Sequence, residues 1–169
     1  FPTRRSSDLA INFNVRFHMA CQKARKLVES EEFGRVNMIH GNYLQEFNAF
    51  PAPVDWRYNP LLAGRMRAVT EIGTHWFDIA QYISGRKVKA LSANFGRFYP
   101  KRYVEDRTMY PDSGDGKRKE TIEVCSEDAA AINLKFDNGA IGTVLLSEVS
   151  QGRINRITLE VTGEKKNLW

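Results

Sequence analysis

The segment 130–145 constrains the fold more than any other part of this sequence. Apolar and polar residues alternate over 130–136 and again over 141–145, which is typical of strands with one buried face. Asp137-Asn138-Gly139 separates the two runs, and asparagine and glycine readily adopt the backbone of a tight turn. The pattern predicts an antiparallel hairpin, and therefore a chain built around a β-sheet.

Two further segments have the spacing of helices. Apolar residues recur every three or four positions over 19–31, and Gly34 is a plausible stop for that helix. A second helix is predicted over 68–83, ending at Ser84-Gly85. Its apolar stripe consists of Ile72, Trp76, Ile79 and Ile83.

The remaining segments predict more strands and two irregular regions. Strand patterns occupy residues 11–15, 36–44, 88–98 and 157–161. Three prolines within 50–62 and a high polar content over 99–128 predict loops. Helices followed by a run of antiparallel strands predict an α+β domain with an open, mostly antiparallel sheet.

Length and cysteine content bound the class of protein. A chain of 169 residues can bury one substantial core, so one domain is expected. It has no run of 18 apolar residues, so no membrane span is predicted. Cys21 and Cys125 stand far apart and outside any C-x-x-C pattern, which favours free thiols in a reducing compartment. A cytoplasmic protein is therefore expected.

The net charge of +5 raises the question of a nucleic-acid partner. Basic residues are scattered among acidic ones, however, and the densest cluster, 117–119, falls in a polar loop rather than on a helix face. The charge pattern indicates a solvated surface, and no nucleic-acid partner is expected.

Residues 1–9, FPTRRSSDL, have neither helical nor strand periodicity. They resemble the in-frame translation of a widely used DNA sequencing adapter, which predicts a foreign segment to be left out of fold reasoning. The alternative is a short disordered terminus, which would look equally featureless. With the first interpretation, the natural chain extends upstream of Ala10, and 10–169 is a partial domain that also looks unfinished after Trp169.

The segment 71–78 carries the most informative polar residues. On a helix, Glu71 and His75 are four residues apart and share a face, and Asp78 lies three residues beyond His75. A carboxylate beside an imidazole can orient the ring, which can then take a proton from an alcohol while hydride leaves the same carbon. The alternative is a surface pair that adds a few tenths of a kcal/mol to helix stability. Gly73, costly inside a helix, indicates a close approach at that point.

Other catalytic motifs are absent from the sequence. H-E-x-x-H does not occur, and the three histidines have no zinc-ligand spacing, so no metal site is predicted. Gly114-Asp115-Gly116 lacks the third glycine of a dinucleotide-binding turn. His18 and His40 have no patterned partner and are interpreted as structural.

The segment 71–78 resembles the D-x-G-x-H-x-x-D helix of the glucose–fructose oxidoreductase, inositol dehydrogenase and rhizopine-catabolism (Gfo/Idh/MocA) family. Further segments resemble the C-terminal domain of this family in the same order, namely 12–17, 32–36, 55–57, 62–64, 127–128 and 136–139. Single residues that match a subgroup of the family are Ser147, Gly152, Arg153, Asn155, Gly163 and Trp169. The resemblance extends over 10–169.

The resemblance implies a two-domain enzyme whose N-terminal Rossmann domain, with the cofactor-binding residues for NAD or NADP, is missing here. The C-terminal domain would have helices on one face of its sheet and would form a homo-oligomer through that sheet. The expected activity is hydride transfer between a sugar or polyol hydroxyl and a nicotinamide, with the isolated chain inactive. The alternatives are a non-catalytic sugar-binding or assembly domain, and a basic nucleic-acid-binding module.

The resemblance also assigns site residues. His75 would be the catalytic base, Glu71 would stand where the family has an aspartate, and a lysine of the Rossmann half would complete the set. The candidates for substrate binding are Asn14, Arg16, Trp56, Arg57 and Asp78. Glutamate is one methylene longer than aspartate, so its geometry relative to His75 can differ, and small displacements can change rates greatly.

Overall fold

The structure is a computed structural model that describes residues 11–112 and 121–169. The predicted foreign segment 1–9, the basic cluster 117–119 and Gly114-Asp115-Gly116 lie outside these ranges.

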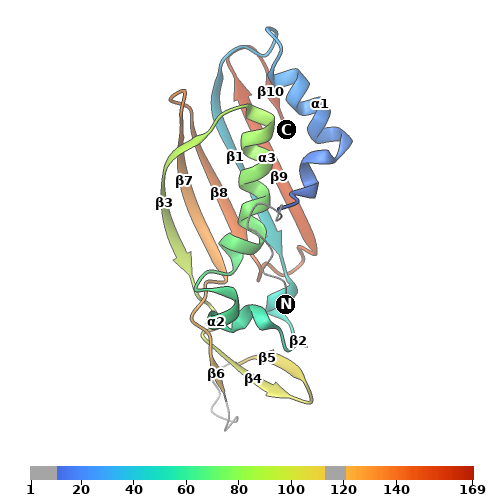
Figure 1. The fold of residues 1–169 in the computed structure, drawn as a ribbon, viewed down its shortest axis with the longest axis vertical. Coiled ribbons are helices and arrows are strands. Elements are labelled where there is room, and N and C mark those ends of the chain that lie inside the picture. Colours follow the sequence, from blue (N-terminus) through green and yellow to red (C-terminus); the bar gives the residue numbers. More distant parts are fainter. Residues whose placement is uncertain (1–10, 113–120) are drawn as a thin grey trace, which may run out of the picture.

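A six-stranded sheet forms the larger part of the molecule (Figure 1). Its strands, in spatial order, are β10 (Asn167–Leu168), β9 (Asn155–Gly163), β1 (Val36–Gln45), β8 (Ile141–Ser147), β7 (Ala129–Phe136) and β3 (Val88–Gly96). β1 and β8 run parallel, and every other neighbouring pair is antiparallel. The predicted hairpin is confirmed as β7 and β8, with Gly139 at φ +87° in the turn. The prediction of an open, mostly antiparallel sheet in an α+β domain is therefore confirmed.

Both long helices cover the same face of this sheet, as expected (Figure 1). α1 (Met19–Val28) lies beside α3 (Thr74–Ser84), and a π-helical turn, η5 (Val69–Gly73), leads into α3. Gly85 ends α3 with φ +66°, a left-handed conformation that glycine adopts without strain.

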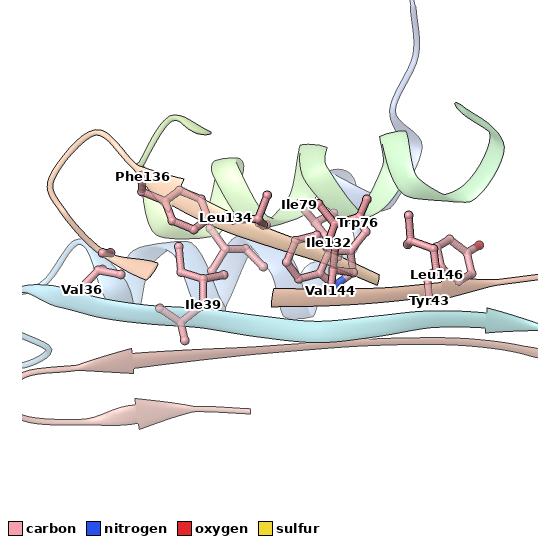
Figure 2. Close-up of a cluster of buried hydrophobic side chains, with 14 of the residues drawn as sticks. Val36, Ile39, Tyr43, Trp76, Ile79, Ile132, Leu134, Phe136, Val144 and Leu146 are labelled. Carbon is pink, nitrogen blue, oxygen red and sulfur yellow. The ribbon is translucent and has the colours of Figure 1, made fainter. Parts of the chain in front are cut away.

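The core lies between α3 and the sheet (Figure 2). The predicted stripe of α3 faces inward, and Trp76 and Ile79 pack over Ile132 and Val144 of the central strands. Burying each such side chain contributes roughly 1.5–3 kcal/mol to folding. The Trp76 indole Nε1 also donates to the carbonyl oxygen of Thr158 at 2.9 Å, which ties α3 to β9.

A second, four-stranded sheet lies at one end of the large one (Figure 1). Its order is β2 (Ala52–Pro53), β5 (Thr108–Pro111), β4 (Lys101–Glu105) and β6 (Ile122–Glu123). Three short helical turns adjoin it, namely η3 (Phe47–Ala49), η4 (Trp56–Tyr58) and α2 (Pro60–Ala63). The segments 50–62 and 99–128, predicted as loops, therefore contain short strands and turns that the sequence did not reveal, because these strands are too short to produce a clear hydrophobic period. Their pairing depends instead on cross-strand contacts such as the stacked rings of Tyr103 and Tyr110.

Two other predictions are corrected. Residues 11–15 form no strand; a 3-10 turn, η2 (Asn14–Phe17), begins there, because Arg16 turns towards Asp78 of α3 and Val15 packs against the core. The first helix ends at Val28 rather than near Gly34, which instead has φ +73° in the turn before β1.

Gly142 of β8 generates a prediction about the large sheet. A Cβ atom at this position would lie 2.1 Å from the carbonyl oxygen of Ile39 on β1, a backbone atom that cannot move alone. We expect Gly142→Ala to lower the free energy of unfolding by roughly 1–3 kcal/mol, measured by denaturant titration. Thr143→Ala, on the exposed side of the same strand, creates no clash and should cost at most about 1 kcal/mol, through lost strand propensity. Equal stability of the two variants would show that β1 and β8 do not approach this closely.

Candidate functional site

A cavity of about 420 Å³ opens where the start of the α3 helix meets β1 and the turns η3 and η4. This volume is in the range of small-molecule sites. The polar residues in its wall are Tyr43, Gln45, Asn48, Asp55, Arg57, Glu71 and His75. The remaining wall residues, Phe47 and Ile72, are apolar. Three of the residues named from the sequence, Glu71, His75 and Arg57, therefore meet at one cavity.

His75 is oriented by packing. Its ring stands edge-on to Phe13, with 5.7 Å between the ring centroids and 89° between the planes. Its Nδ1 is buried and has no hydrogen-bond partner among the described residues. A buried nitrogen of this kind loses its hydration without compensation, which is costly unless a hydrogen-bond partner is supplied.

Glu71 lines the cavity beside His75 but pairs with a different residue. Its Oε1 forms an ion pair with Nε of Arg57, and no hydrogen bond to His75 is found among the described residues. The two residues are separated by the end of the π-helical turn, in which the Thr74 amide donates to Val69, five residues back. The α-helical geometry that the four-residue spacing assumes is therefore altered between them.

Arg57 is held from three sides. Its Nη1 lies 2.7 Å from Oδ2 of Asp55, its Nε pairs with Glu71, and its guanidinium carbon is 5.1 Å from the centre of the Trp56 ring. Asp55 Oδ1 also accepts a hydrogen bond from the Arg57 amide at 3.0 Å, which caps the turn η4. Trp56 itself is 56% exposed and lines an adjoining hollow with Arg57 and Glu71. The three charged side chains Asp55, Arg57 and Glu71, called the clamp below, form one connected unit.

Three other substrate-binding candidates do not line this cavity. Arg16 makes a two-pronged ion pair with Asp78, whose side chain is only 7% exposed, and the Arg16 guanidinium also lies over Tyr82. Asn14 lines a separate, mostly apolar cavity together with Phe17. This arrangement holds η2 against α3, and a part for Asn14, Arg16 and Asp78 in substrate binding stays a prediction.

Several wall residues were not identified from the sequence. Tyr43 is 9% exposed and lies on the buried face of β1. The alternation of buried and exposed residues along this strand therefore predicts a core residue at this position and gives no sign of a cavity. Asn48 and Gln45 flank a short turn with no recognisable motif. Asp55 was part of the family-like segment 55–57, and its position two residues before Arg57 is the one signal that could have revealed the pairing.

A fully buried charge cluster supports the wall of the cavity. Arg67, Asp128 and Glu148 have side chains that are 0–2% exposed. Arg67 Nη2 donates to Asp128 Oδ1, and its Nε lies 2.9 Å from Glu148 Oε2. Asn48 Nδ2 donates to the same Glu148 oxygen at 2.6 Å. Glu148 thus joins the cluster directly to a residue of the cavity wall.

The cluster also fixes the start of the site helix and the small sheet. Glu127 accepts hydrogen bonds from the amides of Arg67 and Val69, at 3.0 and 2.9 Å. Arg102 of β4 donates to the Asn48 carbonyl oxygen at 2.6 Å. The two bonds to Glu127 satisfy free amides at the start of the helix, where a carboxylate is favoured.

Burial shifts the pKa of two side chains at this cluster, Tyr58 and Glu148. The Tyr58 ring lies between Arg67 and Arg102, 4.6 and 4.7 Å from their guanidinium carbons. Burial raises the pKa of Tyr58 to about 12, so its hydroxyl group stays protonated and the ring contacts both cations as a neutral aromatic group. Burial also raises the pKa of Glu148, while Arg67 and Asn48 oppose that shift.

Within the described ranges, no three histidine, cysteine or acidic residues gather as metal ligands. No helix among the described residues is long and apolar enough to cross a membrane.

Comparison with known proteins decides the family. Residues 21–169 match the GFO/IDH/MocA C-terminal domain model. The chain belongs to the Gfo/Idh/MocA family. The levoglucosan dehydrogenase of Pseudarthrobacter phenanthrenivorans is 31% identical over 163 residues, which are 94% of this chain and 40% of that protein. The Gfo/Idh/MocA chain thus spans about two fifths of this relative.

Solved structures give the same result. An oxidoreductase domain protein from Kribbella flavida has a TM-score of 0.79 and 31% identity, over 92% of this chain and 39% of that one. Levoglucosan dehydrogenase in complex with NADH and L-sorbose has a TM-score of 0.78 and 31% identity, over 92% and 38%. The fold expected for a Gfo/Idh/MocA C-terminal domain is therefore confirmed.

The buried cluster of Arg67, Asp128 and Glu148 leads to a prediction about the stability of this Gfo/Idh/MocA domain. Arg67→Met keeps the approximate volume of the side chain but leaves Asp128 and Glu148 without their cation inside the protein. We expect the free energy of unfolding to fall by roughly 3–5 kcal/mol in a denaturant titration. Arg25→Met, which breaks an exposed ion pair with Glu29, should leave stability close to that of the wild type. A small effect of Arg67→Met would mean that its partners stay solvated or protonated.

Proposed function

We propose that this chain is the C-terminal, substrate-side part of an oxidoreductase that transfers hydride between a sugar or polyol and NAD or NADP. A Rossmann half would precede residue 10, and the isolated chain would be inactive. One observation carries the proposal: the unpartnered Nδ1 of His75 is buried beside a cavity of about 420 Å³ with a polar wall. The similarity to levoglucosan dehydrogenase, a protein solved with NADH, levoglucosan and L-sorbose, supports the substrate class.

The dinucleotide would be held by the other half. The sequence contains no G-x-G-x-x-G, and the described glycines with positive φ lie in separate turns. A nicotinamide bound there supplies the hydride acceptor. This chain supplies the opposite wall, with hydroxyl, amide and carboxylate groups that can bind sugar hydroxyl groups.

The proton is assigned to His75. An imidazole nitrogen takes the hydroxyl proton as the carbon–oxygen bond gains double-bond character, and it returns the proton in the reverse direction. Ring packing against Phe13 holds the imidazole in place for this step. Glu71, at the position of the family aspartate, acts through its charge and its contact with Arg57 rather than through a hydrogen bond to the ring.

One observation favours a second function. Because Glu71 pairs with Arg57, the carboxylate–imidazole contact that the family motif implies is missing among the described residues. A non-catalytic domain that binds sugars or assembles with its own copies would tolerate this loss. An upstream half without a glycine-rich turn and the family lysine would support this alternative, and translation of the genomic DNA before residue 10 would decide it.

We also propose that the uncovered face of the large sheet joins two copies of the chain. Met38, Ile141 and Leu145 occupy neighbouring positions of β1 and β8 on this face, and Ile141 and Leu145 are 57% and 53% exposed. Exposed apolar groups on a sheet face are typical of interfaces.

A reducing, cytoplasmic location is expected as well, because Cys21 and Cys125 are free thiols.

His75→Ala tests the proposed reaction. In the two-domain protein, the variant should lower kcat for sugar oxidation at least about a hundredfold, the usual scale for general acid–base catalysis. Nicotinamide reduction at 340 nm with a panel of neutral sugars and polyols gives the rate. His18→Asn, at the start of α1 and away from the cavity, is the control and should keep wild-type turnover. Near-normal turnover by His75→Ala would exclude His75 as the base.

Leu145→Lys tests the interface. A charge in the middle of the uncovered face should disfavour association and shift the mass measured by light scattering towards the monomer. Leu61→Lys, at a residue of α2 that is 92% exposed, is the control and should leave the mass unchanged. If Leu145→Lys also leaves it unchanged, the copies associate elsewhere or not at all.

A further inference from the structure

The charges in the wall of the His75 cavity do not balance. Arg57 is the one arginine or lysine in this wall, and it faces two carboxylates, those of Asp55 and Glu71. With His75 counted as neutral, the wall carries a net charge of −1. Among the buried charges nearby, two cations, Arg67 and Arg102, are outnumbered by three carboxylates, those of Asp128, Glu148 and Glu127, so they add no excess positive charge.

The guanidinium of Arg57 is also committed. Its Nε and Nη1 are used by Glu71 and Asp55, and one face of the group lies over the Trp56 ring. A ligand carboxylate or phosphate could approach the remaining Nη2 donors only beside the two carboxylates that already pair with this cation, or it would displace one of them. The displaced carboxylate, 31% or 32% exposed as a side chain, would then face the ligand as a like charge.

The same contacts leave acceptors free for uncharged ligands. Glu71 pairs with Arg57 through Oε1, so Oε2 is the oxygen that remains for a ligand hydroxyl group. Asn48, Gln45 and Tyr43 in the wall can donate or accept in addition. Hydroxyl groups can donate to the carboxylates without removing Arg57 from either of them.

We propose that the clamp of Asp55, Arg57 and Glu71 is a charge filter, which admits uncharged polyhydroxyl ligands and rejects their carboxylate-bearing and phosphate-bearing analogues. This inference rests on the proposed function, because it assigns a selectivity to the same cavity. Arg57 holds both carboxylates in the wall, and their combined negative charge exceeds its own positive charge, which disfavours anionic ligands.

A binding experiment tests the filter with D-glucose and D-glucuronate, which differ by one CH₂OH group replaced by a carboxylate. The Kd of each is measured by isothermal titration or by protein-detected NMR on the two-domain protein. The wild type should bind D-glucose at least roughly tenfold more tightly than D-glucuronate. Glu71→Gln should narrow this ratio, and Asp55→Asn with Glu71→Gln should reverse it, because the wall then has a net charge of +1 and Arg57 is free.

Glu29→Gln is the matched control. Glu29 pairs with Nε of an arginine, Arg25, through its Oε1, as Glu71 does with Arg57, but it lies just after α1, away from the cavity. This variant should keep the wild-type ratio. Thermal unfolding of each variant shows whether the fold is retained, and Glu71→Gln alone suffices if the double variant does not fold.

Each outcome bears on the filter. Equal affinities in the wild type, an unchanged ratio in Glu71→Gln, or binding of neither sugar would overturn it. Nicotinamide reduction is a separate measurement: if glucose is selected by charge but no sugar in the panel is oxidised, the filter stands and the proposed reaction fails. If a sugar acid is oxidised at the rate of its neutral analogue, the proposed reaction stands and the filter fails.

Discussion

The buried pairing of Arg67 with Asp128 and Glu148 is the interaction on which the rest of the site depends. Charges without solvent are costly unless they are paired with opposite charges, so these groups fix one another closely. Asp128 also accepts the amides of Phe98 and Tyr99, at 2.6 and 2.9 Å, which sets the path of the chain from β3 into the small sheet. One cluster therefore determines how the helix, the two sheets and the cavity wall meet.

The position of the helix above the sheet depends on a small residue. A Cβ atom on Gly73 would lie 2.6 Å from Cδ1 of Leu146, so glycine allows the π-helical turn to approach β8 closely. The indication of a close approach at this glycine is thus explained by packing. The same turn carries Glu71 towards Arg57, which links the packing of the core to the charge of the cavity.

The parts of the fold that could be predicted are those in which burial repeats along the sequence. The apolar stripe of α3 and the alternation of apolar and polar residues in β7 and β8 each mark one buried face, so the helix and the hairpin could be predicted. The small sheet, the turn at Asn14 and the pairing of Arg57 with Glu71 depend on contacts between distant residues, which no local period records. Glu71 and His75 were recognised by their motif, whereas Tyr43 and Asn48 join the cavity only after β1 and η3 have folded against the helix.

The parallel pairing of β1 with β8 has a consequence for folding. Both neighbours of β1 come from the last third of the chain, since β8 begins at Ile141 and β9 at Asn155. Such non-local pairing requires the closure of a long loop and slows folding. During synthesis, β1 leaves the ribosome with both of its edges unpaired, because 95 residues separate Gln45 at its end from Ile141 at the start of β8. A nascent chain that stalls before β8 therefore exposes a strand with two open edges, the feature that most readily recruits other chains into aggregates.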